Sequence, residues 1–257
     1  MTTAATTTPP TPPTVAPTTS TARSSLPGAA TSRAVIDLGA IAHNGSLLAQ
    51  AAGVPWMAVV KADAYGHGLG PVALTALSAG ASWLGVAQLA EALTLRSLLD
   101  EAGVPRPAGE PSGRAPRVLT WLLPVMDPAR AAAQDSPLRA ALAADLDLSV
   151  SSLSQLDALL AAVRAQGIPA RLHLKVDTGM SRGGAMEEDL PALAAALKRA
   201  VDEGTVDVVG LWSHLSRADE PTSGSTEEHL GRYRGAERIV REAGLNPPIH
   251  HLAATGG

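Results

Sequence analysis

The chain has 257 residues, a formal net charge of −4 and a hydrophobic fraction of 46%. It contains no cysteine, which excludes disulfides, thiolate catalysis and sulfur-ligated metals and agrees with a reducing cytosol. The charge is small and no block of basic residues occurs, so nothing favours nucleic acid or a membrane surface as a partner. No apolar stretch approaches the ~20 residues of a membrane span. We therefore expect a cytoplasmic protein without a metal site.

The first segment, residues 1–32, consists almost entirely of Thr, Pro, Ala and Ser. Such a composition buries too little apolar surface to offset the entropy of ordering the chain, so we expect a disordered tail. The segment lacks the apolar core of a signal peptide, which argues against export. The expected organisation is therefore a tail over 1–32 and a folded domain over 33–257.

From residue 34 onward, short apolar runs alternate with helix-like segments. Gly53, Gly80, Gly103 and Gly244 stand where helices are expected to end, and Asp127 with Pro128 has the pattern of a helix start. This alternation predicts a parallel sheet with crossover helices. Strands are expected at 34–37, 56–60, 83–86, 118–122, 147–150, 171–176, 206–212 and 249–253, and helices at 38–52, 71–79, 89–102, from 128, 151–165, 187–203 and 226–243.

The strand count is one short of a closed barrel. The run at 34–37 precedes the regular alternation, which leaves about seven strands, whereas a (β/α)8 barrel of the TIM type has eight. A sheet of this kind would expose unpaired backbone groups at two edges. We therefore expect an incomplete TIM-type α/β barrel and a sequence that is part of a longer protein.

Residues 60–68, V-K-A-D-A-Y-G-H-G, place Lys61 at the end of an apolar run and directly before a glycine-rich turn. A lysine there is a candidate nucleophile, because barrel enzymes keep catalytic groups at the carboxyl ends of their strands. The alternative is an ordinary surface lysine. The nine residues resemble the V-K-A-[ND]-A-Y-G-H-G motif of the alanine racemase family, fold-type III enzymes that use pyridoxal phosphate (PLP). The resemblance implies that Lys61 forms a Schiff base with PLP and acts as a base, and that Tyr65 binds the phosphate.

A second motif, L-K-V-D-T-G-M-S-R at 174–182, is similar to the family's L-K-x-D-T-G-M-[GS]-R. The resemblance implies that Arg182 donates to the phenolic oxygen of PLP and to the substrate carboxylate. A planar guanidinium suits both acceptors. Lys175 corresponds to a lysine that is carbamylated in many members and steadies this arginine. Taken alone, Arg182 could be a solvated loop residue and Lys175 an ordinary strand lysine.

Two further segments extend the resemblance. G-L-W-S-H-L at 210–215, followed by A-D-E at 218–220, resembles the family segment whose histidine lines the PLP ring, here His214. The sequence H-L-A-A-T-G-G at 251–257 resembles H-x-A-N-S-A-A. Thr255 keeps the hydroxyl that binds the PLP phosphate in the family, Ala254 replaces the usual asparagine, and His251 corresponds to a supporting histidine.

The resemblance covers 34–257 and implies the N-terminal part of a racemase. The C-terminal β-domain, with the tyrosine that serves as second base across a homodimer, is expected to lie outside this sequence. The implied activity is PLP-dependent interconversion of L- and D-alanine for peptidoglycan, with little activity from this chain alone. Two alternatives stay open: a PLP-binding barrel of the PLP-homeostasis type, and a non-functional remnant. Serine or lysine also remains open as a substrate.

Overall fold

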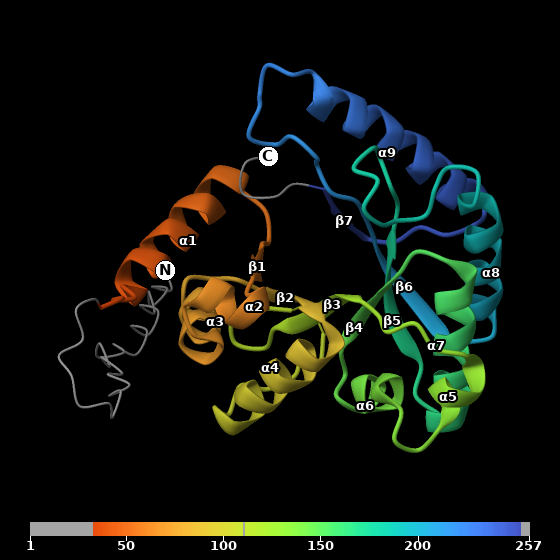
Figure 1. Cartoon of the computed structure of the whole chain (residues 1–257), viewed down its shortest axis with the longest axis horizontal. Helices are drawn as coiled ribbons and strands as arrows, with labels where there is room; N and C mark the ends of the chain where they lie inside the picture. The colour runs from red at the N-terminus through yellow and green to blue at the C-terminus, as the bar shows by residue number, and fades with distance from the viewer. Residues whose placement is uncertain (1–32, 110, 253–257) are drawn as a thin grey trace, which may run out of the picture.

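The computed structural model describes residues 33–109 and 111–252, which form one sheet of seven parallel strands in sequence order. The sheet curls into an incomplete barrel, with β1 and β7 at its two ends (Figure 1). This confirms the predicted α/β barrel-type fold and the expected number of strands. The strands are β1 (Met57–Val59), β2 (Trp83–Gln88), β3 (Arg117–Leu122), β4 (Asp147–Val150), β5 (Ala170–Lys175), β6 (Val206–Trp212) and β7 (Ile249–His251).

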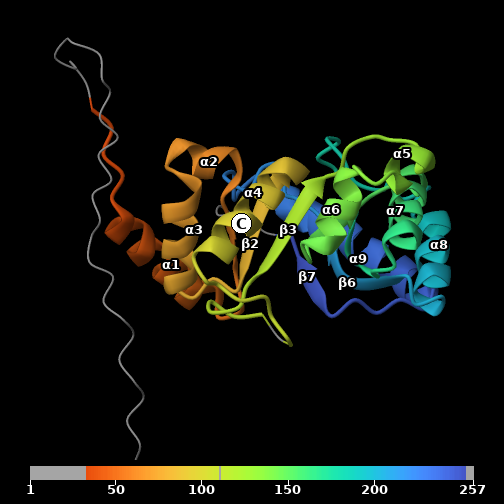
Figure 2. The same cartoon turned by 90° about the horizontal axis from the view of Figure 1, so that it is seen from below.

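Helix α1 precedes the first strand, the other helices connect successive strands, and all lie around the outside of the curled sheet, as the two views in Figures 1 and 2 show. They are α1 (Leu38–Ala52), α2 (Lys61–Gly66), α3 (Leu69–Ser78), α4 (Leu89–Glu101), α5 (Pro128–Ala132), α6 (Pro137–Ala143), α7 (Leu153–Gln166), α8 (Leu190–Asp202) and α9 (Ser225–Glu242).

Several helix boundaries follow the capping residues in the sequence. Asp37 begins α1 by accepting a hydrogen bond from the backbone N–H of Ala40 at 3.0 Å. Gly53 ends the same helix in the left-handed conformation, at φ 64°. Asp127 begins α5 in the same way as Asp37 begins α1, with Pro128 at the first helical position. These caps explain why the observed ends agree with the predicted ones.

Three segments differ from expectation. Residues 34–37 form no strand; Val35 is 66% exposed, and no strand of the described chain pairs with this run. A β-strand is stable only with a partner, and this run lacks one, so it leads into α1 as irregular chain. The short helices α2 and α6 were not predicted. The expected tail at 1–32 and the segment 253–257 lie outside the described residues.

The strands alternate between an apolar outer face and a mixed inner face. Leu84, Leu148, Leu172 and Leu174 point outward and join the helices in one hydrophobic cluster. Each is fully buried, and burying a leucine contributes about 1.5–3 kcal/mol. The inner face instead carries rings, including Trp83, which meets the ring of His173 edge-on at a centroid separation of 5.3 Å.

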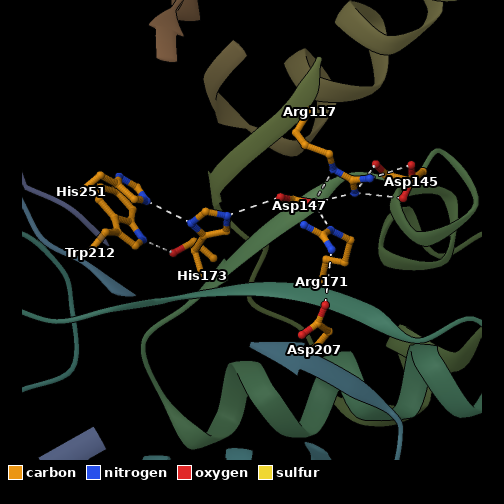
Figure 3. A network of polar contacts seen from close by, with 9 residues as sticks. Arg117, Asp145, Asp147, Arg171, His173, Asp207, Trp212 and His251 are labelled. Atoms are coloured by element: carbon orange, nitrogen blue, oxygen red, sulfur yellow. Dashed lines mark hydrogen bonds and ion pairs between the residues drawn. The ribbon is translucent and has the colours of Figure 1, made fainter. Parts of the chain in front are cut away.

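An ionic network joins the amino ends of the central strands on this inner face (Figure 3). Arg117 of β3 donates to Asp147 of β4 at 3.0 and 2.6 Å and also to Asp145. Arg171 of β5 donates to Asp147 at 3.1 Å and to Asp207 of β6 at 3.3 Å. The buried Asp147 carboxylate is therefore compensated from both neighbouring strands, as a buried charge requires.

Candidate functional site

The site residues predicted from sequence stand at the carboxyl ends of the strands. Lys61 stands two residues after the end of β1, and Lys175 is the last residue of β5. His214 comes two residues after β6, and His251 is the last residue of β7. Because the strands are parallel, these ends share one rim of the barrel, which is where barrel enzymes bind and convert substrates.

Lys61 opens a turn with an unusual backbone. The four residues that follow it have φ between 52° and 57° and form a left-handed helical turn, although none is glycine. Each such residue costs about 1–2 kcal/mol. Backbone bonds hold the turn: Ala64 N–H donates to Val60 O, and Gly68 N–H donates to Asp63 O, each at 2.9 Å. Such strain persists only where its surroundings enforce it, and it marks functional sites.

Glu91 on α4 is one of the groups that enforce the turn. Its Oε1 accepts from the backbone N–H of Ala62 at 2.6 Å. Its Oε2 accepts from the N–H groups of Ala87 and Gln88 at 3.0 and 2.8 Å. One carboxylate therefore joins the start of α4 to the residue after Lys61. The sequence analysis missed this role, although an acid three residues into a helix is a recognised capping signal.

Tyr65 lies in the left-handed turn and is 59% exposed. The Nζ of Lys61 is 5.7 Å from the centre of its ring. The structure thus keeps the amine and the phenol close together on the same rim, and leaves the phenol accessible to a ligand.

Lys175 is buried, and its Nζ lies 4.8 Å from the centre of the Trp212 ring. Burial lowers the pKa of Lys175, the positive charge of Arg182 lowers it further, and Asp177 opposes both effects. Asp177 also orders the loop that leads to Arg182, since its Oδ1 accepts from the N–H groups of Gly179 and Ser181 at 2.8 and 3.2 Å. Arg182 itself is exposed at the rim.

The pKa of His214 is sensitive to the other residues predicted for the site. Its pKa is lowered by burial first, and then by the positive charges of Arg182, Lys175 and Lys61. These charged side chains come from the ends of two strands, β1 and β5, and act on an imidazole at the end of a third strand, β6. They make a cationic cluster at the rim, which suits an anionic ligand such as a phosphate or a carboxylate.

His251 is linked to the interior network of Figure 3 rather than to this cationic cluster. Its Nε2 lies 3.0 Å from Nδ1 of His173, whose Nε2 lies 3.4 Å from Asp147 Oδ2. Its ring stacks on Trp212 at 5.1 Å. Burial, together with His173 and His250, lowers the pKa of His251 to about 3. The supporting role expected for His251 stays a prediction.

Thr255, the predicted phosphate ligand, lies outside the described residues. Among residues 33–109 and 111–252, no group of three or more His, Asp or Glu side chains is arranged to hold a metal ion. Over the same residues, no helix combines the length and the apolar character that crossing a membrane requires.

Fold and site together define an α/β barrel-type domain with a lysine-bearing, cationic rim at the carboxyl ends of its strands. The family described as alanine racemase, N-terminal domain, matches residues 36–257. The chain belongs to this family.

Known relatives agree in sequence and in structure. The alanine racemase of Beutenbergia cavernae is 49% identical over 226 residues, which cover 88% of this chain and 54% of that protein. The structure of alanine racemase from Streptomyces coelicolor matches with a TM-score of 0.75 at 41% identity, over 86% of this chain and 53% of that one. The enzyme from Streptomyces lavendulae gives 0.75 at 38% identity, over 86% and 52%. The chain thus spans about half the length of these relatives.

Proposed function

We propose that residues 33–257 form the PLP-binding barrel domain of an alanine racemase and that Lys61 is the residue that binds the cofactor covalently. The observation that carries this proposal is that Lys61, Lys175 and His214 stand at the carboxyl ends of parallel strands and so share one rim of the barrel. The relatives from Beutenbergia cavernae and Streptomyces coelicolor are named alanine racemases, which supports alanine as the substrate.

The residues present suit PLP, because its phosphate and its phenolic oxygen are anionic and the rim is cationic. Bound PLP supplies an electron sink for the negative charge that develops at the α-carbon of the substrate. The chain would supply the rest: Lys61 moves a proton on one face of that carbon, and Arg182 binds the substrate carboxylate. Lys175 would steady Arg182 once carbamylated, because the carbamate is an anion that can accept from the guanidinium.

The remaining predicted residues would hold the cofactor. Tyr65, on the strained turn, and Thr255 would bind the phosphate through their hydroxyl groups. His214 would lie against the ring, and its lowered pKa keeps its imidazole neutral among the neighbouring cations. His251 would support the site through its contacts with Trp212 and His173 in the interior of the barrel.

The wider setting also follows from the family. We propose that the complete protein is a cytoplasmic homodimer and that its D-alanine product supplies peptidoglycan.

Borohydride trapping tests the cofactor assignment directly. The chain has three lysines, Lys61, Lys175 and Lys198, so peptide mapping by mass spectrometry distinguishes every lysine adduct. We expect a reduced PLP adduct on the peptide that contains Lys61. The Lys61→Ala variant should lose it, and the Lys198→Ala variant, altered on the outer helix α8, should keep it. An undiminished adduct in Lys61→Ala, or one on Lys175, would refute the assignment.

A further inference from the structure

His229 is a buried histidine that the proposed chemistry leaves unused. It lies in the first turns of α9 and is 3% exposed. Its Nδ1 lies 2.7 Å from Oγ1 of Thr178, in the loop after β5, and its Nε2 lies 2.8 Å from Oγ of Ser216, in the loop after β6. One imidazole thus joins two loops that are far apart in sequence.

The hydrogen bonds around His229 assign its tautomer. The backbone N–H of Ser216 donates to Nε2 at 3.4 Å, so Nε2 is the acceptor. Nδ1–H then donates to Thr178 Oγ1, which leaves the Thr178 hydroxyl to donate to Ser213 Oγ at 2.8 Å. All three buried polar side chains are satisfied by this single arrangement, as stable buried networks require.

The side chain of Arg232, one turn further along α9, contacts the backbone of the loop after β5. Its Nη1 donates to Thr178 O at 3.2 Å. Gly179 has a φ of 127°, and a Cβ built there would lie 2.4 Å from Nη1 of Arg232. The positive φ favours glycine at this position, whereas the flexible Arg232 side chain could move to relieve the contact alone. His229 and Arg232 hold the side chain and the carbonyl of one residue, Thr178.

The two loops that His229 joins carry the residues assigned to the cofactor. Thr178 stands four residues before Arg182, within a turn that the Asp177 carboxylate ties to Gly179 and Ser181. Ser213 and Ser216 stand on either side of His214 in the sequence. A shift of His229 would therefore change the separation between the loops that bear Arg182 and His214.

We propose that His229 is a positioning residue that couples the Arg182 loop to the His214 loop and so keeps the cofactor site assembled without touching the cofactor. This inference rests on the proposed function. It assigns α9 a role in ligand binding that no residue of that helix has from the sequence motifs. Since the contacts act on loops already in place, their loss should weaken binding of PLP rather than abolish it.

The test combines hydrogen exchange of the apo chain with PLP titration followed by visible absorbance. In His229→Leu, we expect faster exchange in 177–182 and 213–217 together and about tenfold weaker PLP binding, a loss of about 1.4 kcal/mol. His229→Gln keeps one donor and one acceptor at similar spacing, so it should recover most of the affinity. Arg238→Gln, an exposed change further along α9, should match the wild type.

Ser216→Ala tests the same link in case the histidine variants misfold. Ser216 is exposed, and its replacement removes only one side-chain contact with His229. It should speed exchange in 213–217 and weaken PLP binding about threefold. Unchanged PLP affinity in His229→Leu and Ser216→Ala would overturn the proposal, and so would loosening of one loop alone in His229→Leu. If the wild type takes up no PLP, the proposed function fails, while exchange in the apo variants still decides whether His229 couples the loops.

Discussion

Glu91 accepts a hydrogen bond from the backbone N–H of Ala62 at 2.6 Å and so fixes the residue that follows Lys61. The other oxygen of the same carboxylate accepts from the N–H groups of Ala87 and Gln88, at the end of β2 and directly before α4. The strained turn after Lys61 is thereby anchored to a neighbouring strand and helix. The anchor thereby constrains the backbone that follows Lys61.

Replacing Glu91 tests that anchor. An amide has one acceptor oxygen, so Glu91→Gln cannot satisfy both Ala62 and the start of α4. We expect the free energy of unfolding to fall by about 1–3 kcal/mol and PLP adduct formation at Lys61 to slow. Urea unfolding and the rate of adduct formation measure the two effects. Glu101→Gln, at the far end of α4, is the control; an equal loss in both variants would contradict a special role for Glu91.

Gly179 and Gly231 form a matched pair of glycines near α9. Gly179→Ala introduces a Cβ at φ 127° against Arg232, and we expect it to lower the free energy of unfolding by at least about 1–2 kcal/mol. Gly231 lies inside α9, with no atom within 4 Å of an added Cβ. Gly231→Ala should therefore stabilise the fold by about 0.5–1 kcal/mol. Thermal and urea unfolding measure both; a stabilising Gly179→Ala would contradict the described turn.

Arg182→Ala tests the electrostatic coupling at the rim. Because Arg182 is the largest charge effect that lowers the pKa of His214, its removal should raise that pKa towards the ordinary value. NMR titration of the His214 ring measures the change. PLP retention on dialysis should weaken as well. Arg164→Ala, an exposed change at the end of α7, should alter neither quantity; an unchanged His214 pKa in Arg182→Ala would place the two side chains apart.

The lowered pKa of His251 leads us to expect that the free energy of unfolding depends on pH. Its folded pKa of about 3 lies below the ordinary 6.5, so between these values the unfolded chain binds a proton that the folded chain does not. Its contribution to stability is full above about pH 6.5 and is lost as the pH falls towards 3. One proton corresponds to a slope of about 1.4 kcal/mol per pH unit.

Urea unfolding at several pH values between 4 and 6 measures this slope. In His251→Gln, it should be shallower by up to that amount. His43→Gln, an exposed change on α1, should leave the slope as in the wild type. Equal slopes in all three proteins would contradict a buried, neutral His251.

The Asp147 carboxylate affects the free energy of unfolding at lower pH than His251 does. Burial alone would raise the pKa of this carboxyl, but the hydrogen bond from His173 and the charge of Arg117 outweigh burial and hold the pKa below its ordinary 3.8. Its stabilising contribution is therefore present above that pH and is lost as the pH falls below it. The two groups act in successive ranges, which lets one pH series separate them.

Much of the fold could be predicted from local signals. Apolar runs bounded by glycine, and caps such as Asp37 and Asp127, fixed the alternation and most helix boundaries. The run at 34–37 was misjudged because its apolar residues satisfy a strand pattern, while pairing depends on distant chain. The left-handed turn after Lys61 was not foreseen, because no glycine occupies its first four positions and long-range bonds enforce it.

The residues of the candidate site also differ in whether local sequence patterns predict them. Lys61, Lys175, Arg182 and His214 stand in motifs that follow strands, so a parallel sheet brings them to one rim. Glu91, His173 and His229 were missed, because each acts through a contact with a residue at least 26 positions away, which is Ala62, Asp147 and Thr178 respectively. Such roles leave no pattern in the neighbouring sequence.

The visible absorption spectrum of the purified chain with added PLP tests the central claim most directly. We expect the band of a lysine–PLP Schiff base in the wild type and in Lys198→Ala, and its loss in Lys61→Ala. Absence of the band from soluble, folded wild-type chain would contradict the claim that these residues assemble a PLP site, and so would a band of equal strength in Lys61→Ala.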